Sequence, residues 1–169
     1  MLRAVALAGI VLASTTPMQL RSADFSAGAV IPRPLMAVDC GGANRSPELT
    51  WSDAPKGVKS FALVMRDPDA PIAGGFTHWV VYNVSAAAHE LSSNAKLAPD
   101  QLGNTSLGKP GYYGPCPPPG PAHHYFFTLY ALDVARVESG SPLSSDQLET
   151  RIEGHVLARA VLEATASRR

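Results

Sequence analysis

The segment GPCPPPGPAHHY at residues 114–125 constrains the fold of this chain more than any other stretch. Proline fixes the φ angle and lacks a backbone N–H, so the proline run can join neither the interior of a sheet nor a helix. The flanking glycines permit close approaches that a side chain would forbid. His123, His124 and Tyr125 then open an apolar run that is typical of a buried strand. A rigid loop that places polar aromatic side chains at the end of a strand is suited to a small-ligand site.

The length and composition indicate one globular domain without a nucleic-acid partner. The chain has 169 residues, of which 46% are hydrophobic, which is enough for a core. Its 14 Lys and Arg balance 14 Asp and Glu. This balance excludes an overall positive charge that would attract nucleic acid or an anionic membrane. The 15 prolines and 14 glycines predict many turns and little helix.

The first residues have the features of a targeting segment. Arg3 is the only charge before an apolar run over residues 4–13, which is too short to span a bilayer. Cleavage could follow Ala13 or occur near Ala23, and the alternative is an N-terminus that is never removed. We therefore predict a signal peptide or disordered segment over residues 1–23 and one domain over residues 24–169. Export to the periplasm or the medium is expected, without stable membrane insertion after cleavage.

The two cysteines, Cys40 and Cys116, could form a disulfide in an oxidising compartment. The alternative is two buried free thiols. A bridge would close a loop of roughly 75 residues, for which chain entropy gives about 4 to 5 kcal/mol of stabilisation. The spacing matches no zinc pattern, and we expect no metal and no cofactor.

Three predicted strands carry apolar residues on both faces and meet polar side chains at one end. They cover residues 59–66, 77–84 and 123–133. Asp67 follows the first strand, His78 lies at the start of the second, and His123 and Tyr125 share one face of the third. If the strands are neighbours, these groups converge on a small polar site, to which backbone amides of residues 111–114 could add donors. The alternative for each is a structural role as a core histidine or a turn-forming aspartate.

The other elements are predicted less sharply. We expect one or two short strands over residues 24–39, a short strand at residues 48–51, and a long surface excursion over residues 85–110. A helix is expected to begin near Gln147 after a cap at Ser145 or Asp146. Residues 160–165 could extend this helix or form a last strand.

Several motifs in order resemble the phosphatidylethanolamine-binding protein family, in its bacterial branch described as Raf-kinase-inhibitor-like. They are CGGANRSPELTW at residues 40–51, DPDAP at 67–71, HWVVYN at 78–83, GPCPP at 114–118 and HHY at 123–125. The similarity runs from about residue 39 to residue 166. It therefore covers nearly the whole chain after the targeting segment.

The resemblance implies a mainly β fold with antiparallel sheets packed face to face as in a sandwich, a few peripheral helices, and a small anion-binding pocket at the strand ends. The residues it implies as lining or framing the pocket are Asp67, His78, Cys116, Pro118, His123 and Tyr125. Structural roles are expected for Asp69, Pro71 and Gly114, and His124 is not expected to be a direct ligand. Relatives often carry Arg-Asn-Asp-Phe-Gly where this chain has NTSLG at residues 104–108, and Phe76-Thr77 replaces a common tryptophan pair at the pocket rim.

The leading hypothesis is non-enzymatic binding of a small phosphorylated or anionic ligand, such as a phosphoethanolamine head group, with a regulatory or inhibitory role. Binding is expected to strengthen between pH 8 and about 6, where histidines gain protons. One alternative is an inhibitor of a kinase or protease that acts through surface loops, chiefly residues 85–110. The other is a hydrolase that uses Asp67, His78 and His123, with or without a metal.

Overall fold

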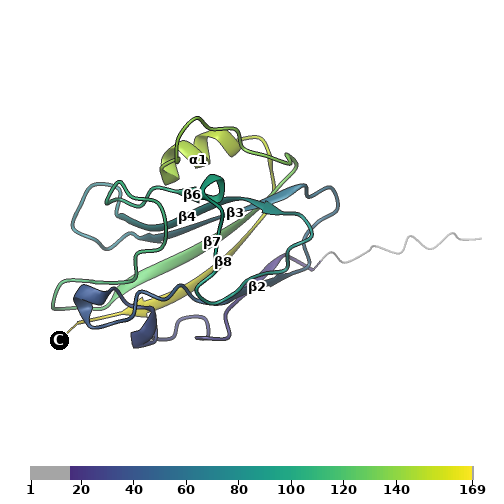
Figure 1. Ribbon diagram of the computed structural model, residues 1–169. Helices are drawn as coiled ribbons and strands as arrows, with labels where there is room; N and C mark the ends of the chain where they lie inside the picture. Colours follow the sequence, from purple (N-terminus) through teal and green to yellow (C-terminus); the bar gives the residue numbers. More distant parts are fainter. Residues whose placement is uncertain (1–15, 169) are drawn as a thin grey trace, which may run out of the picture.

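Two antiparallel sheets form the framework of the computed structural model, which describes residues 16–168 (Figure 1). The order of strands is β6-β4-β3-β7-β8 in the larger sheet and β1-β2-β5 in the smaller one. The strands are β1 (Gln19–Arg21), β2 (Leu49–Ser52), β3 (Ser60–Asp67), β4 (Phe76–Ser85), β5 (Glu90–Leu91), β6 (Leu102–Gly103), β7 (His123–Leu132) and β8 (Val156–Ala166). The helices are α1 (Ser145–Ile152) and the 3-10 turns η1 (Arg33–Leu35), η2 (Val38–Cys40) and η3 (Pro99–Gln101). The predicted mainly β fold with antiparallel sheets is confirmed.

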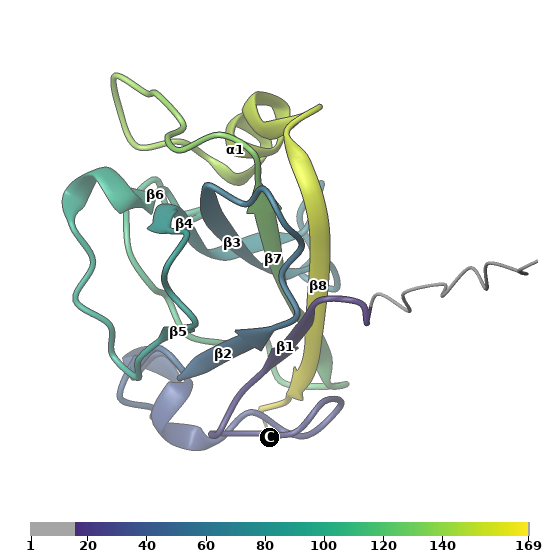
Figure 2. The same cartoon turned by 90° about the vertical axis from the view of Figure 1, so that its right-hand side faces the viewer.

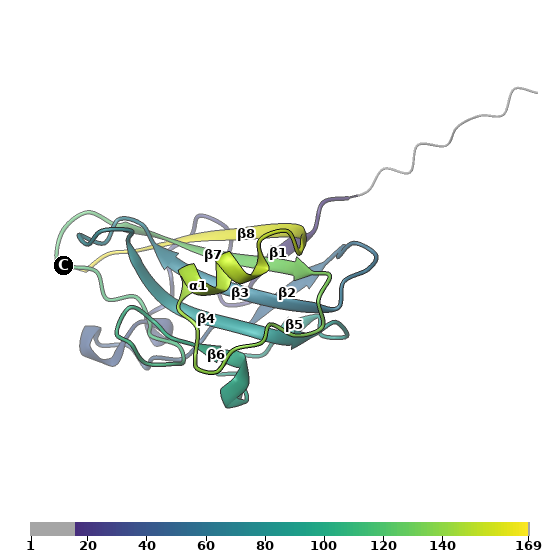
Figure 3. The same ribbon diagram turned by 90° about the horizontal axis from the view of Figure 1, so that it is seen from above.

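Both faces of the larger sheet are covered, which is why its central strands are apolar on both sides. The smaller sheet lies on one face and α1 on the other, as Figures 2 and 3 show. The core between the sheets includes Trp51 of β2 and Phe61 of β3, whose ring centroids are 5.2 Å apart. On the opposite face, Leu148 and Ile152 of α1 belong to a second cluster with side chains of β3, β4 and β7. The interior strands β3, β4 and β7 are therefore the rigid part on which a site can be built.

The structure corrects two of the less sharply predicted regions. Residues 24–39 form the turns η1 and η2 in place of strands, because Pro32 and Pro34 remove donors and fix φ just where pairing would begin. Residues 85–110 are not one irregular excursion, since β5 pairs with β2 and β6 pairs with β4. Two-residue strands are too short to leave a periodic pattern in the sequence.

The two ends of the described chain are both held in sheets. The last segment is the strand β8, which pairs with β7 along its length, so of the two alternatives the strand is correct. At the other end, β1 pairs with β2, and Met18 and Leu20 are buried in the core. Ordered residues thus precede residue 24, whereas the prediction for residues 1–15 lies outside the described part of the chain.

Candidate functional site

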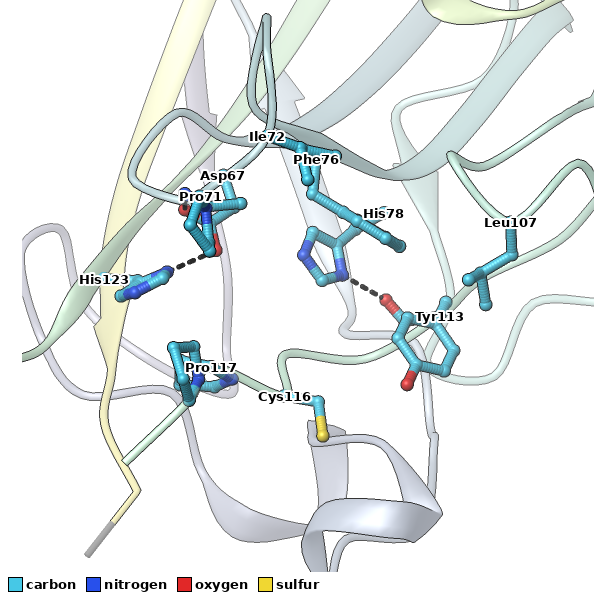
Figure 4. A pocket seen from close by; sticks show the side chains of 12 residues that line it. Asp67, Pro71, Ile72, Phe76, His78, Leu107, Tyr113, Cys116, Pro117 and His123 are labelled. Carbon is cyan, nitrogen blue, oxygen red and sulfur yellow. Dashed lines mark hydrogen bonds and ion pairs between the residues drawn. The ribbon is translucent and has the colours of Figure 1, made fainter. Parts of the chain in front are cut away.

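A pocket of about 190 Å³ lies where β3 ends and where β4 and β7 begin (Figure 4). The strands contribute Asp67, Phe76, His78 and His123 to its lining. The remaining lining residues come from two loops and are Ala70, Pro71, Ile72, Leu107, Tyr113, Cys116, Pro117 and Pro118. Two imidazoles and one carboxylate therefore face a mostly apolar cavity.

Asp67 and His123 form a buried pair at one side of the pocket. The Nδ1 atom of His123 lies 2.7 Å from Oδ2 of Asp67, and both side chains are almost fully buried. The second carboxylate oxygen accepts the backbone N–H groups of Asp69 and Ala70 at 2.9 and 3.0 Å. These three hydrogen bonds fix the carboxylate, which in turn orients the imidazole of His123.

An irregularity in β4 decides where His78 points. The ladder with β3 pairs Arg66 with Thr77 and Met65 with Trp79, so His78 is an extra residue without a partner. Simple alternation predicts that His78 shares a face with Val80 and Tyr82, and this prediction is wrong. Those two side chains pack in the cluster under α1, whereas the His78 ring packs against Tyr125 in the core between the sheets. The bulge turns His78 to the face that carries Asp67.

His78 is held as a neutral imidazole. Its Nδ1 atom is 2.7 Å from the carbonyl oxygen of Tyr113, which can only accept, so Nδ1 carries the proton. Burial lowers the pKa of His78 from its usual value to about 4, because the charged ring loses its hydration. Near pH 7 the other nitrogen, Nε2, is therefore an acceptor, and Figure 4 shows it directed away from Tyr113.

Tyr125 frames the site from behind and is not among the lining side chains. Its ring is fully buried and meets the His78 ring edge-on, with centroids 5.2 Å apart. Burial raises the pKa of Tyr125 above its ordinary value, and the Asp67 carboxylate raises it further. Its hydroxyl has no hydrogen-bond partner within residues 16–168.

The proline-rich wall is fixed to the rest of the fold by a disulfide. Cys116 is bonded to Cys40 at the end of η2, so the bonded alternative is the correct one. Gly114 precedes this point, and a Cβ atom there would lie 2.3 Å from the carbonyl oxygen of Leu35. Only glycine fits this approach, which supports the structural role expected for Gly114.

The backbone amides of the loop before the wall are already engaged. The N–H of Tyr113 donates to the carbonyl of His78 at 2.9 Å, and the N–H of Gly114 donates to Oδ1 of Asn44 at 2.8 Å. These two amides are therefore not available as the donors that the sequence predicted for residues 111–114. Between Pro115 and Pro118, Cys116 alone carries a backbone N–H.

A second acid–histidine pair lies beside the first and is open to solvent. The Asp69 carboxylate accepts from the backbone N–H and from Nδ1 of His124 at 2.8 and 2.6 Å. The hydrogen bond from the His124 backbone lowers the pKa of Asp69, and the hydrogen bond to Asp69 raises the pKa of His124. Asp69 thereby ties the loop after β3 to β7, and His124 is absent from the pocket lining.

Sequence reasoning therefore found most of the polar residues around the pocket and missed several apolar ones. Asp67, His78, Cys116, Pro118 and His123 line it as expected, and Pro71, expected only as a structural residue, lines it as well. The apolar residues Ile72 and Leu107, together with Tyr113, were not predicted as lining residues. They lie in loops, where no periodicity reveals the direction of a side chain. Phe76 was placed at the rim by the family resemblance, and it lines the pocket.

No group of three or more His, Cys, Asp or Glu side chains within residues 16–168 is arranged to hold a metal ion. None of the helices in the described part of the chain is long and apolar enough to cross a membrane.

Comparisons with known proteins agree with the resemblance noted in the sequence. One similar crystal structure is CT736 of Chlamydia trachomatis, which is described as a phosphatidylethanolamine-binding protein homologue. It superposes with a TM-score of 0.82 at 37% identity, and the match covers 90% of this chain and 99% of CT736. YbcL of Escherichia coli, described as a new member of the mammalian PEBP family, gives a TM-score of 0.84 at 30% identity over 91% of this chain and 100% of its own.

Sequence comparison adds a relative and a family. LppC of Mycobacterium tuberculosis, named as a lipoprotein, is 42% identical over 120 residues, which are 70% of this chain and 57% of that protein. None of these three names describes an enzyme. The sequence model of the phosphatidylethanolamine-binding protein family matches residues 21–167. This chain therefore belongs to the phosphatidylethanolamine-binding protein family.

Proposed function

We propose that the pocket binds the phosphoryl or other anionic group of a small molecule without changing it chemically. The observation that carries this proposal is the convergence of His78 and the Asp67–His123 pair on one small cavity with otherwise apolar walls. A few fixed polar groups in an apolar pocket are typical of small-ligand sites. A regulatory or inhibitory role of the bound state rests on the family resemblance alone.

The polar groups around the pocket include both donors and acceptors. The Cys116 amide can donate, and His123, whose Nδ1 proton is directed at the Asp67 carboxylate, can donate from Nε2 when its ring is protonated. Neutral His78 can only accept at Nε2. A phosphate that retains one proton offers what both kinds of group require, namely acceptor oxygens and one O–H donor.

His78 gains no proton between pH 8 and 6, because burial lowers its pKa to about 4, so at this residue the pH dependence has to come from the ligand. The second pKa of a phosphate monoester is about 6, so the protonated monoanion becomes the main form as the pH falls from 8 to below 6. We expect affinity to rise over this range. Sulfate carries no proton in this pH range, so it cannot donate an O–H to His78. We therefore expect sulfate to bind more weakly than phosphate.

The deciding experiment is an NMR titration of residues 16–169 with inorganic phosphate, O-phosphoethanolamine and sulfate at pH 8 and pH 6. Saturable shifts at Asp67, His78 and Tyr125 are expected for the two phosphates. They should be lost in His123→Ala and retained in the matched control His124→Ala, because His124 lies outside the lining. If neither phosphate produces a shift at millimolar concentration, the pocket is not an anion site.

The lining supports binding over nucleophilic hydrolysis. Its described residues include no serine, threonine or lysine, and Cys116 has no free thiol because it is bonded to Cys40. A hydrolase would have to use the Asp67–His123 pair as a general base toward water. Turnover of a phosphate ester that disappears in Asp67→Ala would replace the binding proposal with the hydrolase.

Export is the second part of the proposal. The disulfide and a relative named as a lipoprotein both point to the cell envelope. Of the two cleavage sites, the one after Ala13 is compatible with the fold, because a cut near Ala23 would remove β1 together with the buried Met18 and Leu20. The mature protein would then retain every residue that the structure describes.

A further inference from the structure

The loop between β3 and β4, residues 68–75, is a wall of the pocket that few polar contacts hold in place. The lining residues that it contributes are Ala70, Pro71 and Ile72. Within residues 16–168, the only hydrogen bonds that join this loop to a strand other than β3 are those that the Asp69 carboxylate accepts from His124 of β7. The polar attachment of this wall to the rest of the sheet therefore rests on one acid–histidine pair.

The far end of the same loop consists of two glycines with left-handed backbone angles. Gly74 and Gly75 have φ values of 80° and 73°. A Cβ atom at Gly75 would lie 2.5 Å from the carbonyl oxygen of Asp67, so this close approach requires glycine. Glycine is the residue that loses most backbone freedom when it is ordered, so this end adds little stiffness. The proline-rich wall, in contrast, is fixed by the disulfide of Cys116, and the β3–β4 loop is the wall that can change position.

Only part of the contact between Asp69 and His124 depends on pH. The backbone N–H of His124 donates to Oδ2 of Asp69 at 2.8 Å, and this bond does not depend on the charge of the ring. The Nδ1 atom of the same residue lies 2.6 Å from the same oxygen, and both side chains are open to solvent. This second contact becomes an ion pair only when the imidazole is protonated at both nitrogens.

The surroundings of His124 favour its charged form. The hydrogen bond to Asp69 raises the pKa of His124 above its usual value of 6.5, against a smaller effect of lost hydration. The negative charges of Asp69, of Glu163 on β8 and of Asp67 raise it further. His123, the neighbouring histidine of β7, lowers the pKa of Asp69 and so keeps that carboxylate charged. The ionic part of the contact is therefore complete below pH 6.5 and is lost as the pH rises through the raised pKa of His124.

Resting on the proposed function, we propose that the Asp69–His124 pair is a pH-sensitive latch that holds the β3–β4 loop in the position that binds the anion. With the latch charged, the wall is fixed before the ligand arrives. With the latch neutral, the loop also occupies other positions, and the affinity falls by the fraction of molecules that remain competent. Because exposed ion pairs contribute weakly, this fall should be about two- to fivefold. His124 is a positioning residue that does not line the pocket, so its variants still reach saturation at higher ligand concentrations.

The first test follows the loop of the ligand-free protein by NMR. Relaxation of the methyl groups of Ala70, Ile72 and Ala73 reports the motion of the loop and is insensitive to amide exchange at high pH. Between pH 6 and pH 9 their order parameters should fall, with the same midpoint as the titration of the His124 ring. In His124→Arg, which stays charged, the loop should remain ordered at both pH values. In His124→Gln it should be as mobile at pH 6 as the parent is at pH 9.

A second acid–histidine pair supplies the matched control. His155 lies with Nδ1 2.9 Å from Asp133, is similarly exposed and is outside the pocket lining. His155→Gln should therefore keep the full pH response of the loop.

Calorimetry with inorganic phosphate measures the consequence for binding. From pH 6 to pH 9, the loss of affinity in the parent should exceed the loss in His124→Arg by about two- to fivefold. Comparing the two proteins removes the contribution of the titration of phosphate itself.

The outcomes separate the latch from the proposed function. If the order of the loop does not change with pH in the parent, or changes equally in His124→Gln, the latch is wrong and the anion site stands. A difference in affinity without a change in loop order also overturns the latch, because the charge of His124 would then act directly on the anion. If phosphate binds to neither protein at either pH, the anion site and its control by the latch are both wrong, whatever the loop does.

Discussion

The buried side chain of His78 should make this protein less stable as the pH is lowered. Its ring is 3% exposed, and burial lowers its pKa from 6.5 to about 4. The unfolded chain therefore takes up a proton at this histidine below pH 6.5, whereas the folded protein does so only near pH 4. The stability that neutral His78 contributes is complete above pH 6.5 and is lost as the pH falls toward 4. At ~1.36 kcal/mol per pKa unit, the whole difference amounts to about 3 kcal/mol.

Urea denaturation at several pH values measures this contribution. Between pH 7.5 and 4.5, the parent should lose about 2 to 3 kcal/mol more unfolding free energy than His78→Gln, which cannot take up the proton. His89→Gln is the control, because His89 is an exposed histidine outside the pocket. NMR of the His78 ring should give a midpoint near 4 directly. A midpoint near 6.5, or equal pH dependence in the parent and His78→Gln, would refute the reasoning.

Three further predictions follow from the wall of the pocket and from the first strand. Replacing both cysteines (C40A with C116A) opens a loop with a sequence separation of 76. The unfolding free energy should therefore fall by about 4 to 5 kcal/mol, and Tm by roughly 10 to 18 °C. A loss below about 1 kcal/mol in urea denaturation would contradict this. Gly114→Ala should cost about 1 to 3 kcal/mol, because its Cβ would lie 2.3 Å from a carbonyl oxygen, whereas Gly140→Ala, with nothing within 4 Å, should stay within about 0.5 kcal/mol of the parent. Intact-mass measurement of the exported protein should give a chain that begins between residues 14 and 18 and so retains β1; a chain that begins at Met1 would exclude cleavage.

The long strands and the polar residues at their ends were predictable because alternation and turn chemistry are local signals. Phe61, Leu63 and Met65 alternate along one face of the predicted strand that Asp67 follows, and these three side chains do pack in the core between the sheets. His123 and Asp67 were expected to converge if their strands were neighbours. The two strands, β3 and β7, are adjacent in the larger sheet.

What the sequence could not predict depends on register and on loops. The bulge in β4 exists only as a shift in pairing between two strands, so nothing near His78 in the sequence announces it. Ile72 and Leu107 are ordinary aliphatic residues in loops, and only the three-dimensional arrangement brings both to the pocket mouth. The engagement of the Tyr113 and Gly114 amides likewise involves partners that are distant in sequence, including Asn44.

The pocket wall is stiff before any ligand arrives. Prolines at positions 115, 117 and 118 restrict its backbone, and the Cys40–Cys116 bond fixes its position on η2. A site with so few donors gains little contact energy from a small anion, but it also loses little conformational entropy when the anion binds. We therefore expect fast association and fast release with little structural change. Occupancy of such a site follows the concentration of its ligand, and the site does not sequester the ligand.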